Sequence, residues 1–374
     1  MRSLVGIIGR SLVMSQRIRV LPIKSCMISI PVGSPWLYSL VEGATQVIVN
    51  YKLIATQASV DLDEVAQANL NMILATIQKT PRSTEEICIN YLVKLCDGGS
   101  LSVAARLLEF LQNRNIFPGP SAYNIVMEAA IEANQLEIVI QVFKHLMMSG
   151  QSMPPSSCLN LAKGFMNTVD DVLLLRLVKQ VSELIFPINM MVINKIIFAF
   201  GECRQFDKAL LIFYQIKELK CRTDLITYNT ILDILGRAGR VDEMLLEFSF
   251  MKEAGIDPDF ISYNTLLNQL QKAGRLDLCL VYIKEMCESG IRPDLLTYTA
   301  LIYSFGRSGN LEESLSLFDD MKIRQIHPSI YVYRSLINTA KKVGKVELAL
   351  TLLEEMNASP QNLTGSIGYK QKRR

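Results

Sequence analysis

The sequence predicts an all-α fold, a right-handed α-solenoid of about eight stacked helix-turn-helix repeats. Residues 225–259 and 260–294 are two 35-residue segments that follow each other without a gap. Both carry Tyr-Asn near the start, Ala-Gly-Arg in the middle and Gly-Ile-x-Pro-Asp at the end. Apolar residues recur within each segment at helical spacing, not at the alternation typical of a strand. Self-similarity at a period of this size indicates a solenoid.

The repeat frame extends over the chain without insertion and predicts two helices in each unit. In the second half of a unit, apolar residues stand three and four residues apart, so they share one helix face. The first half carries its own stripe, as in Tyr228, Ile231, Leu232 and Leu235. One hairpin alone cannot bury both stripes, so stacked hairpins should form a continuous core. The eight units start at residues 85, 120, 155, 190, 225, 260, 295 and 330.

Glycine and proline mark the ends of the predicted helices. In the unit that starts at residue 225, Gly239 stands between the two helices and Gly255 follows the second one. Glycine tolerates the positive φ that a tight turn after a helix often requires. Pro258 then prevents the helix from resuming. These positions predict where each hairpin turns.

The ends of the chain differ from the repeats. Residues 1–59 have the composition of an organellar transit peptide, because Arg is frequent and no Asp or Glu occurs before Glu42. The scattered arginines favour a mitochondrial destination, with a plastid as the alternative. Residues 60–84 are expected to form an N-terminal capping helix, and the solenoid should span residues 85–359. Residues 360–374 form a basic tail that we expect to be disordered.

Composition limits the function classes. Residues 1–59 contain six of the 39 Lys and Arg and one of the 36 Asp and Glu, so the remainder has 33 basic and 35 acidic residues, a net charge of about −2. That balance lacks the general basic footprint of non-specific nucleic-acid binders. The eight cysteines form no C-x-x-C pair and are expected to be buried thiols. We expect no catalytic site, no metal site, no cofactor and no membrane insertion.

The repeat units resemble pentatricopeptide repeats of the pure 35-residue (P-type) subfamily, which is typical of plant organellar proteins. The family pattern V-T-Y-N-T-L-I…A-G…F…M…G-I-x-P-D is matched by residues 226–232, 238–240, 248, 251 and 255–259. The resemblance covers about residues 85–359 and is strongest from residue 190 onwards. It implies a solenoid that binds single-stranded RNA, with one unit facing one base.

The resemblance also implies which positions read the bases: the fifth and the thirty-fifth of each unit. Units four to six carry Asn with Asp there, a pair that prefers uridine in the family. Unit seven has Thr299 with Ser329, which resembles the purine readers, and unit two has Asn124 with Pro154. The predicted site is therefore U-U-U-purine, read 5′ to 3′ by units four to seven. The Asn and Asp readers are Asn194 with Asp224, Asn229 with Asp259, and Asn264 with Asp294.

The second position of each unit should supply the apolar surfaces that hold the bases. Such stacking contacts tolerate any sequence and contribute affinity. The fifth positions of units one, three and eight, Ile89, Leu159 and Arg334, fall outside the family code. We therefore expect these units to add spacing and stacking only. The base-stacking residues are Met191, Ile226, Ile261, Leu296 and Tyr331.

Two alternatives remain open at this level. Helix N-caps are expected at Asp224, Asp259 and Asp294, or just after them at Thr227, Ser262 and Thr297, and capping alone would select such residues. The whole chain could also be a protein-binding solenoid within an organellar ribonucleoprotein or a ribosome-associated complex. In the favoured interpretation, a monomer binds an organellar transcript and acts in its stabilisation, processing, splicing or translation.

Overall fold

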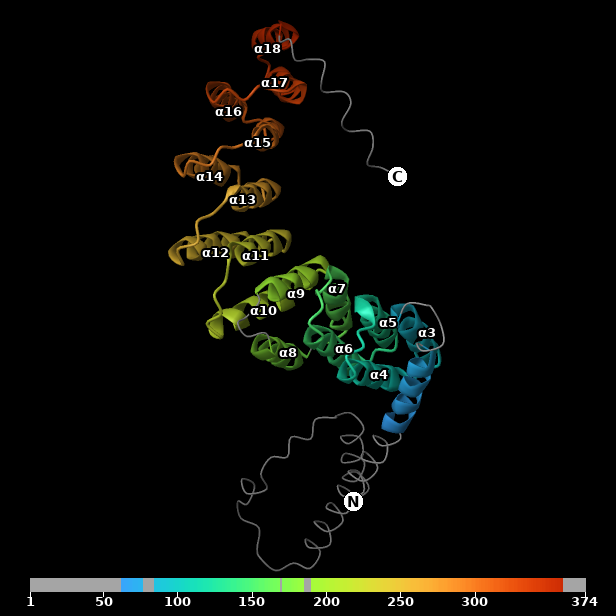
Figure 1. Cartoon of the computed structure of the whole chain (residues 1–374). Coiled ribbons are helices and arrows are strands. Elements are labelled where there is room, and N and C mark those ends of the chain that lie inside the picture. Colours follow the sequence, from blue (N-terminus) through green and yellow to red (C-terminus); the bar gives the residue numbers. More distant parts are fainter. Residues whose placement is uncertain (1–61, 77–83, 169, 185–189, 359–374) are drawn as a thin grey trace, which may run out of the picture. The chain divides into compact units, whose positions relative to one another are not determined.

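The computed structural model describes residues 62–76, 84–168, 170–184 and 190–358 (Figure 1). Every regular element in these ranges is a helix, and the helices follow one another through short connections. The proposed transit peptide and the basic tail lie outside the described residues. A helix at residues 62–76 precedes the repeats and lies within the stretch 60–84 that was predicted to cap them.

The described helices form pairs that follow the 35-residue frame. From unit three onwards the first helix of a unit begins at position one, and in every unit the second helix begins at position seventeen. The fold is therefore the predicted all-α repeat solenoid. The first helices are α3 Thr84–Asp97, α5 Gly119–Glu132, α7 Pro155–Gly164, α9 Met190–Glu202, α11 Leu225–Arg237, α13 Phe260–Lys272, α15 Leu295–Arg307 and α17 Ile330–Lys342. The second helices are α4 Leu101–Asn113, α6 Leu136–Met148, α8 Asp171–Leu184, α10 Phe206–Glu218, α12 Val241–Glu253, α14 Leu276–Glu288, α16 Leu311–Ile323 and α18 Val346–Ala358.

Wherever these positions are described, both turns of a hairpin use a residue with positive φ at a fixed position. The turn inside the hairpin has it at position fifteen, as at Gly239 (φ 74°), and the turn to the next unit has it at position thirty-one, as at Gly255 (φ 73°). Arg204 and Lys220 adopt the same conformation in unit four, with φ of 57° and 54°. The stacking therefore imposes this geometry even where the residue is not glycine.

Lys220→Gly is expected to stabilise the protein. The left-handed conformation costs a non-glycine residue about 1–2 kcal/mol, and a change to glycine removes this cost. Because glycine also gives the unfolded chain more conformational entropy, part of the gain in folding free energy is lost again. We expect a net gain of about 0.5–1 kcal/mol, seen as a higher urea midpoint. The reciprocal change, Gly255→Lys at the same position of the next unit, should lower the midpoint. A lower midpoint for Lys220→Gly would contradict this account.

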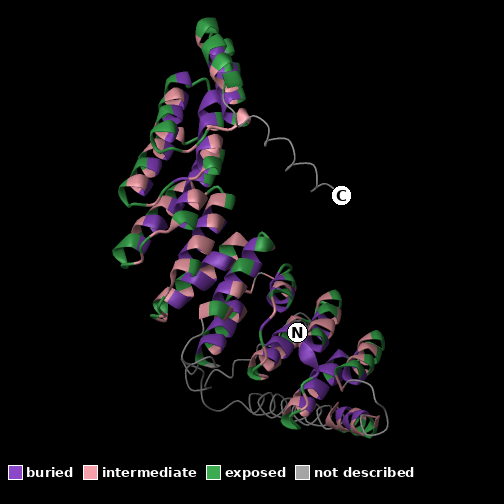
Figure 2. Ribbon diagram, turned by 45° about the horizontal axis from the view of Figure 1, so that its top comes forward, coloured by how far each residue is buried: buried purple, intermediate pink, exposed green. Residues whose placement is uncertain are grey.

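Buried residues lie on both helices of the units (Figure 2), with more of them on the first helix, as in α11 compared with α12. Tyr228, Ile231 and Leu235 of α11 are at most 2% exposed. The tyrosine at position four packs edge-on against a phenylalanine from the second helix of the preceding unit. Ring centroids are 5.9 Å apart for Tyr228 and Phe213. The same contact is present at Phe248–Tyr263 and Phe318–Tyr333, each at 5.4 Å, so it links successive units.

The second-helix stripe is buried less completely than expected. Positions twenty, twenty-four and twenty-seven are buried in unit five, as Met244, Phe248 and Met251 show. Positions seventeen and twenty-one are only half-buried there. The reason is that, from α10 onwards, the second helices pack mainly on first helices and contact one another only through side chains. In α18 the stripe residues Val346 and Leu350 are 57% and 55% exposed, since no further unit covers them in the described part of the chain.

Glycine at position twelve allows successive first helices to approach closely. A Cβ on Gly236 of α11 would lie 2.1 Å from Cγ of Gln269 in α13. A Cβ on Gly201 would lie 2.8 Å from Cγ1 of Ile234, and one on Gly306 would lie 2.5 Å from Oγ1 of Thr339. Real atoms do not approach this closely, so the separation between these helices requires glycine.

The cysteines are free thiols, as expected, but only part of the set is buried. Cys88, Cys158 and Cys279 are buried, and burial raises the pKa of the Cys158 thiol to about 12. The other four described cysteines are half-buried, and Cys26 lies outside the described residues. No helix in the described ranges is long and apolar enough to cross a membrane.

Candidate nucleic-acid interface

The aspartates at position thirty-five cap the first helices of units five to seven. Asp224 has extended backbone angles and accepts a hydrogen bond from the backbone N–H of Thr227 at 2.8 Å. Asp259 and Asp294 accept the equivalent bond from Ser262 and Thr297, also at 2.8 Å. The capping role considered from the sequence is therefore confirmed. It does not account for the asparagines at position five.

Each of these asparagines is held by the unit that follows it. The hydroxyl oxygen of Thr227 lies 2.8 Å from Oδ1 of Asn194 and 2.7 Å from Oδ1 of Asp224. Nδ2 of Asn194 in turn donates to Oδ1 of Asp224 at 3.0 Å. Because a carboxylate can only accept, the amide nitrogen must face the aspartate. The predicted pair of Asn and Asp is thus brought together across two units.

Unit five repeats the whole arrangement, whereas unit six keeps the hydroxyl contacts to Asn264 and Asp294 but has no hydrogen bond from the Asn264 amide to Asp294. Nδ2 of Asn229 donates to Asp259 at 3.2 Å, and the Ser262 hydroxyl donates to Oδ1 of Asn229 at 2.6 Å. In the following unit the Thr297 hydroxyl donates to Oδ1 of Asn264 at 2.7 Å. Asn194 is only 6% exposed, whereas Asn229 and Asn264 are half-buried. Units five and six therefore present the more accessible amides.

The hydroxyl at position three is a site residue that the sequence reasoning had considered only in connection with helix capping. Its role is to orient the asparagine of the preceding unit. The same contact occurs in unit two, where the Ser157 hydroxyl donates to Oδ1 of Asn124 at 2.6 Å. There Nδ2 of Asn124 donates to Ser156 at 2.9 Å, in place of the predicted partner Pro154. The sequence signal that could have predicted this role is the Ser or Thr that recurs at position three.

Thr299 and Ser329 do not form an equivalent pair. The Thr299 hydroxyl donates to the carbonyl of Leu295 in its own helix at 2.6 Å. Ser329 is the N-cap residue of α17, but its side chain makes no capping hydrogen bond. Unit seven therefore lacks the interlocked polar group of units four to six. The structure leaves its preference for a purine untested.

Burial and hydrogen bonding act in opposite directions on the capping aspartates. Burial disfavours the charged form of Asp224, but hydrogen bonds from Thr227 and Asn194 outweigh it, so the pKa of Asp224 lies below its ordinary value. Burial likewise opposes ionisation of Asp259, and the bonds from Ser262 and Asn229 lower its pKa. Both carboxylates are therefore charged at neutral pH.

A row of exposed apolar side chains accompanies the amides. The residues at position two of units four to eight are 53–70% exposed, although they are large and hydrophobic. Each lies three residues before the fifth position, about one helical turn away on the same face. Exposure of such a side chain in every one of five successive units is consistent with a stacking surface. The exposed fractions are 60% for Met191, 63% for Ile226, 59% for Ile261, 70% for Leu296 and 53% for Tyr331.

Basic residues at position thirteen follow the same period, and the sequence reasoning missed them. Units five to eight carry a basic residue at the end of the first helix: Arg237, Lys272, Arg307 and Lys342. Units one, two and four carry Asp97, Glu132 and Glu202 there. The charge at this position therefore changes sign along the chain. Cations occupy the same half of the chain as most of the amides.

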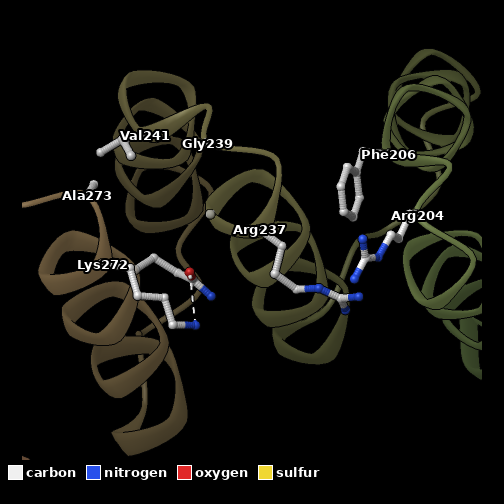
Figure 3. A pocket seen from close by; sticks show the side chains of 9 residues that line it. Arg204, Phe206, Arg237, Gly239, Val241, Lys272 and Ala273 are labelled. Atoms are coloured by element: carbon white, nitrogen blue, oxygen red, sulfur yellow. Dashed lines mark hydrogen bonds between the residues drawn. The ribbon is translucent and has the colours of Figure 1, made fainter.

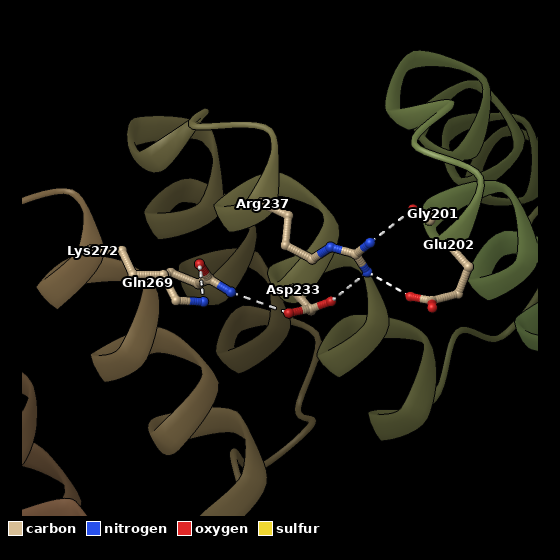
Figure 4. Close-up of polar contacts among 6 residues, drawn as sticks. All are labelled: Gly201, Glu202, Asp233, Arg237, Gln269 and Lys272. Atoms are coloured by element: carbon tan, nitrogen blue, oxygen red, sulfur yellow. Dashed lines mark hydrogen bonds and ion pairs between the residues drawn. The ribbon is translucent and has the colours of Figure 1, made fainter. Parts of the chain in front are cut away.

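Arg237 is already paired with acidic residues (Figure 4). Its Nη1 lies 2.7 Å from Oε1 of Glu202 and 3.3 Å from Oδ2 of Asp233. Oδ1 of Asp233 accepts a hydrogen bond from Nε2 of Gln269 at 3.1 Å. This network joins α9, α11 and α13. It also compensates the charge of Arg237. The other basic residues at position thirteen, Lys272, Arg307 and Lys342, have no carboxylate partner among the described residues.

A hollow of about 630 Å³ lies beside this network (Figure 3). Arg204, Arg237 and Lys272 line it from three successive units, together with Gln269. The Arg237 guanidinium lies 5.7 Å from the ring centroid of Phe206, which also lines the hollow. Gly236 of α11 and the turn glycine Gly239 also line it. The lining is positively charged overall, because only Arg237 is paired with carboxylates.

The fold and this site define a helical-repeat protein with one polar reading position per unit. Family models for pentatricopeptide repeats match residues 166–238 (pentatricopeptide repeat domain), 223–272, 258–307 and 297–342 (PPR repeat family) and 331–359 (PPR repeat). Together they span residues 166–359, more than half of the chain. The protein belongs to the pentatricopeptide repeat family, and its 35-residue units are of the P type.

Known relatives match only part of the protein. A pentatricopeptide repeat-containing protein of Arabidopsis thaliana is 47% identical over 124 residues, which is 33% of this chain and 34% of that protein. The match thus spans about a third of the relative's length.

Similar solved structures include the maize pentatricopeptide repeat protein PPR10, with 21% identity, a TM-score of 0.41, and coverage of 77% of this chain and 43% of that one. PPR10 in complex with an 18-nt psaJ RNA element has 15% identity and a TM-score of 0.40, covering 78% and 48%. The repeat domain of Arabidopsis thaliana protein-only RNase P 1 in complex with tRNA has 16% identity and a TM-score of 0.38, covering 44% and 88%.

Proposed function

We propose that this protein binds single-stranded RNA sequence-selectively, with units four to seven facing U-U-U-purine in the 5′ to 3′ direction. The observation that carries the proposal is the interlocked Asn, Asp and hydroxyl group of units four to six, repeated beside exposed apolar side chains. The aspartates also cap helices, but capping requires neither the asparagine amides nor the exposed apolar side chains. Family membership supports RNA as the ligand.

The chemistry of the interlocked group fits uracil. In unit five, Oδ1 of Asn229 accepts one bond from Ser262, and Nδ2 gives one of its two hydrogens to Asp259. One acceptor lone pair and one donor hydrogen therefore remain for a base. The second carboxylate oxygen of Asp259 receives no side-chain hydrogen bond within the described residues and can accept the N3–H of uracil, directly or through water. Cytosine has an acceptor at N3, which the carboxylate disfavours.

The charge pattern favours an RNA backbone path along the C-terminal half of the described repeats. Lys272, Arg307 and Lys342 can each neutralise a phosphate, whereas Asp97 and Glu132 repel one and Glu202 is paired with Arg237. We therefore propose a short footprint centred on units four to eight. We further propose that the protein acts in the mitochondrion, with a plastid as the alternative. There it would occupy a short transcript segment and so protect it or guide processing, splicing or translation, without catalysis of its own.

Binding to short oligonucleotides tests this proposal. The full chain is expected to bind a single strand containing UUUA at least about tenfold more tightly than the same strand containing CCCA, because each mismatched base typically costs ~1–3 kcal/mol. Fluorescence anisotropy of labelled strands measures the difference. With three uncompensated cations, log K should fall with log[salt] at a slope of about −2. Equal binding of both strands, or no binding to either, would refute base reading.

A protein-binding solenoid is the second candidate. The acidic position thirteen of units one, two and four favours it, because that part of the chain is poorly suited to RNA. It predicts a partner protein that stays bound after nuclease treatment of a pull-down. Loss of all partners on nuclease treatment would instead favour RNA as the ligand.

A further inference from the structure

Arg334 occupies the reading position of the last unit. It is the fifth residue of α17, in register with the asparagines of units four to six and with Thr299. Its side chain is exposed and forms no hydrogen bond or ion pair within the described residues. By contrast, Arg237, Arg240 and Arg324 are all paired with carboxylates. The Arg334 guanidinium is therefore available to a ligand.

The surroundings of Arg334 favour a nucleotide. Tyr331, one helical turn earlier, is 53% exposed and is the only aromatic residue in the apolar row at position two. Bases stack on aromatic side chains, a contact typically worth ~1–3 kcal/mol per base. Residues 329–346 contain no acid but include Lys341, Lys342 and Lys345. The first helix of unit eight and the turn after it thus combine a stacking surface with basic residues and no acid.

An arginine selects a different base from an asparagine. The Asn amide offers a donor and an acceptor, whereas the guanidinium offers donors only, in a planar fork. A base that pairs with this fork must present two adjacent acceptors. Guanine does so through O6 and N7, and cytosine through N3 and O2. Uracil and adenine place a donor next to each acceptor on the pairing edge, so the fork leaves one of its bonds unmade.

We propose that Arg334, with Tyr331 as its stacking platform, selects the base on the 3′ side of the purine and favours guanine or cytosine over uracil and adenine. The proposal rests on the RNA-binding function proposed above and extends the site from four bases to five. Unit eight then contributes specificity, in contrast to the spacing role expected from the sequence alone.

Four strands that share UUUA and differ only in the next base provide the test. The full chain is expected to bind the strands ending in G or C about tenfold more tightly than those ending in U or A, since a bidentate arginine contact discriminates by about that much. The relative affinities of the G and C strands tell which acceptor pair is used. Equal affinity for all four strands, or preference for U or A, would overturn the proposal.

Two variants separate base reading from simple charge attraction. Arg334→Lys keeps the charge but loses the fork, so it should abolish discrimination at the fifth base and leave the affinity for the U strand nearly unchanged. The matched control, Lys345→Gln, removes a nearby charge and should weaken all four strands equally. Retained discrimination in Arg334→Lys would refute the fork. Failure of the UUUA-over-CCCA preference in the unmodified chain would instead show that the proposed function itself is wrong.

Discussion

Replacing Asp224, Asp259 and Asp294 together by asparagine is expected to reverse the base preference from UUU to CCC. Asparagine is as good an N-cap as aspartate, so helices α11, α13 and α15 should remain capped. Its amide can donate to N3 of cytosine, whereas the carboxylate accepts the N3–H of uracil. Each mismatch between a unit and its base is expected to cost ~1–3 kcal/mol. Over three units, the ratio of the affinities for the two strands should therefore shift by more than about a hundredfold. Anisotropy titrations with UUUA and CCCA strands measure it.

The chain provides a matched control for this triple variant. Asp207, Asp242 and Asp277 stand at position eighteen of units four to six, and their side chains are 98%, 92% and 71% exposed. Changing these three to asparagine alters the net charge by the same amount in the same period. We expect general tightening on all strands and no change of preference. A reversal in the control, or none in the position thirty-five triple, would mean that the capping aspartates do not read bases.

Gly236→Ala is expected to destabilise the protein by about 1–3 kcal/mol, the usual effect of overpacking. Helix propensity alone predicts the opposite, because alanine is favoured over glycine by about 1 kcal/mol inside a helix. The added Cβ would lie 2.1 Å from Cγ and 2.7 Å from Cβ of Gln269. Since Cβ of Gln269 is fixed to its backbone, α11 and α13 must move apart. Urea unfolding followed by circular dichroism measures the loss.

A double-mutant cycle assigns this loss to one contact. Gln269→Ala removes the opposing Cγ and its hydrogen bond to Asp233, so it should be destabilising alone. Combined with Gly236→Ala, it should cost less than the sum of the two single changes. Gly98→Ala, in the hairpin turn of unit one, is the control for adding a Cβ without close helix contact, because the nearest atom there would be 3.3 Å away. A stabilising Gly236→Ala, or strictly additive effects, would contradict close helix contact at this glycine.

The repeat frame was predictable from the sequence because it depends on periodicity. Positions one and seventeen begin the helices, and the buried Tyr228 and Leu232 follow the predicted stripe. The unequal burial of the second helices was not predictable. Val241 and Val346 occupy the same position in their units, yet one is half-buried and the other 57% exposed. Which residues cover such a position depends on the neighbouring unit, and the pattern within one unit does not encode that.

The candidate site also has a part that was predictable from the sequence and a part that was not. Asn229 and Asp259 stand out in the sequence because they repeat without serving the core. Their contact at 3.2 Å across two units, and the Ser262 hydroxyl that fixes the amide, could be seen only in three dimensions. Position three had been interpreted as a capping residue, which is also correct. One hydroxyl serves both purposes because the N-cap of one unit adjoins the reading residue of the unit before it.

The period, the turn positions and the residue types at each reading position could be predicted from the sequence, because all of them are local properties of a 35-residue unit. The tertiary structure decided which amides are oriented and accessible, which cations remain unpaired, and why glycine occupies position twelve in units four, five and seven. The physical reason is that each of these properties arises from contacts between side chains about 30 to 36 residues apart, such as Asn194 with Asp224 and Arg237 with Glu202. Stacking alone brings those side chains within bonding distance.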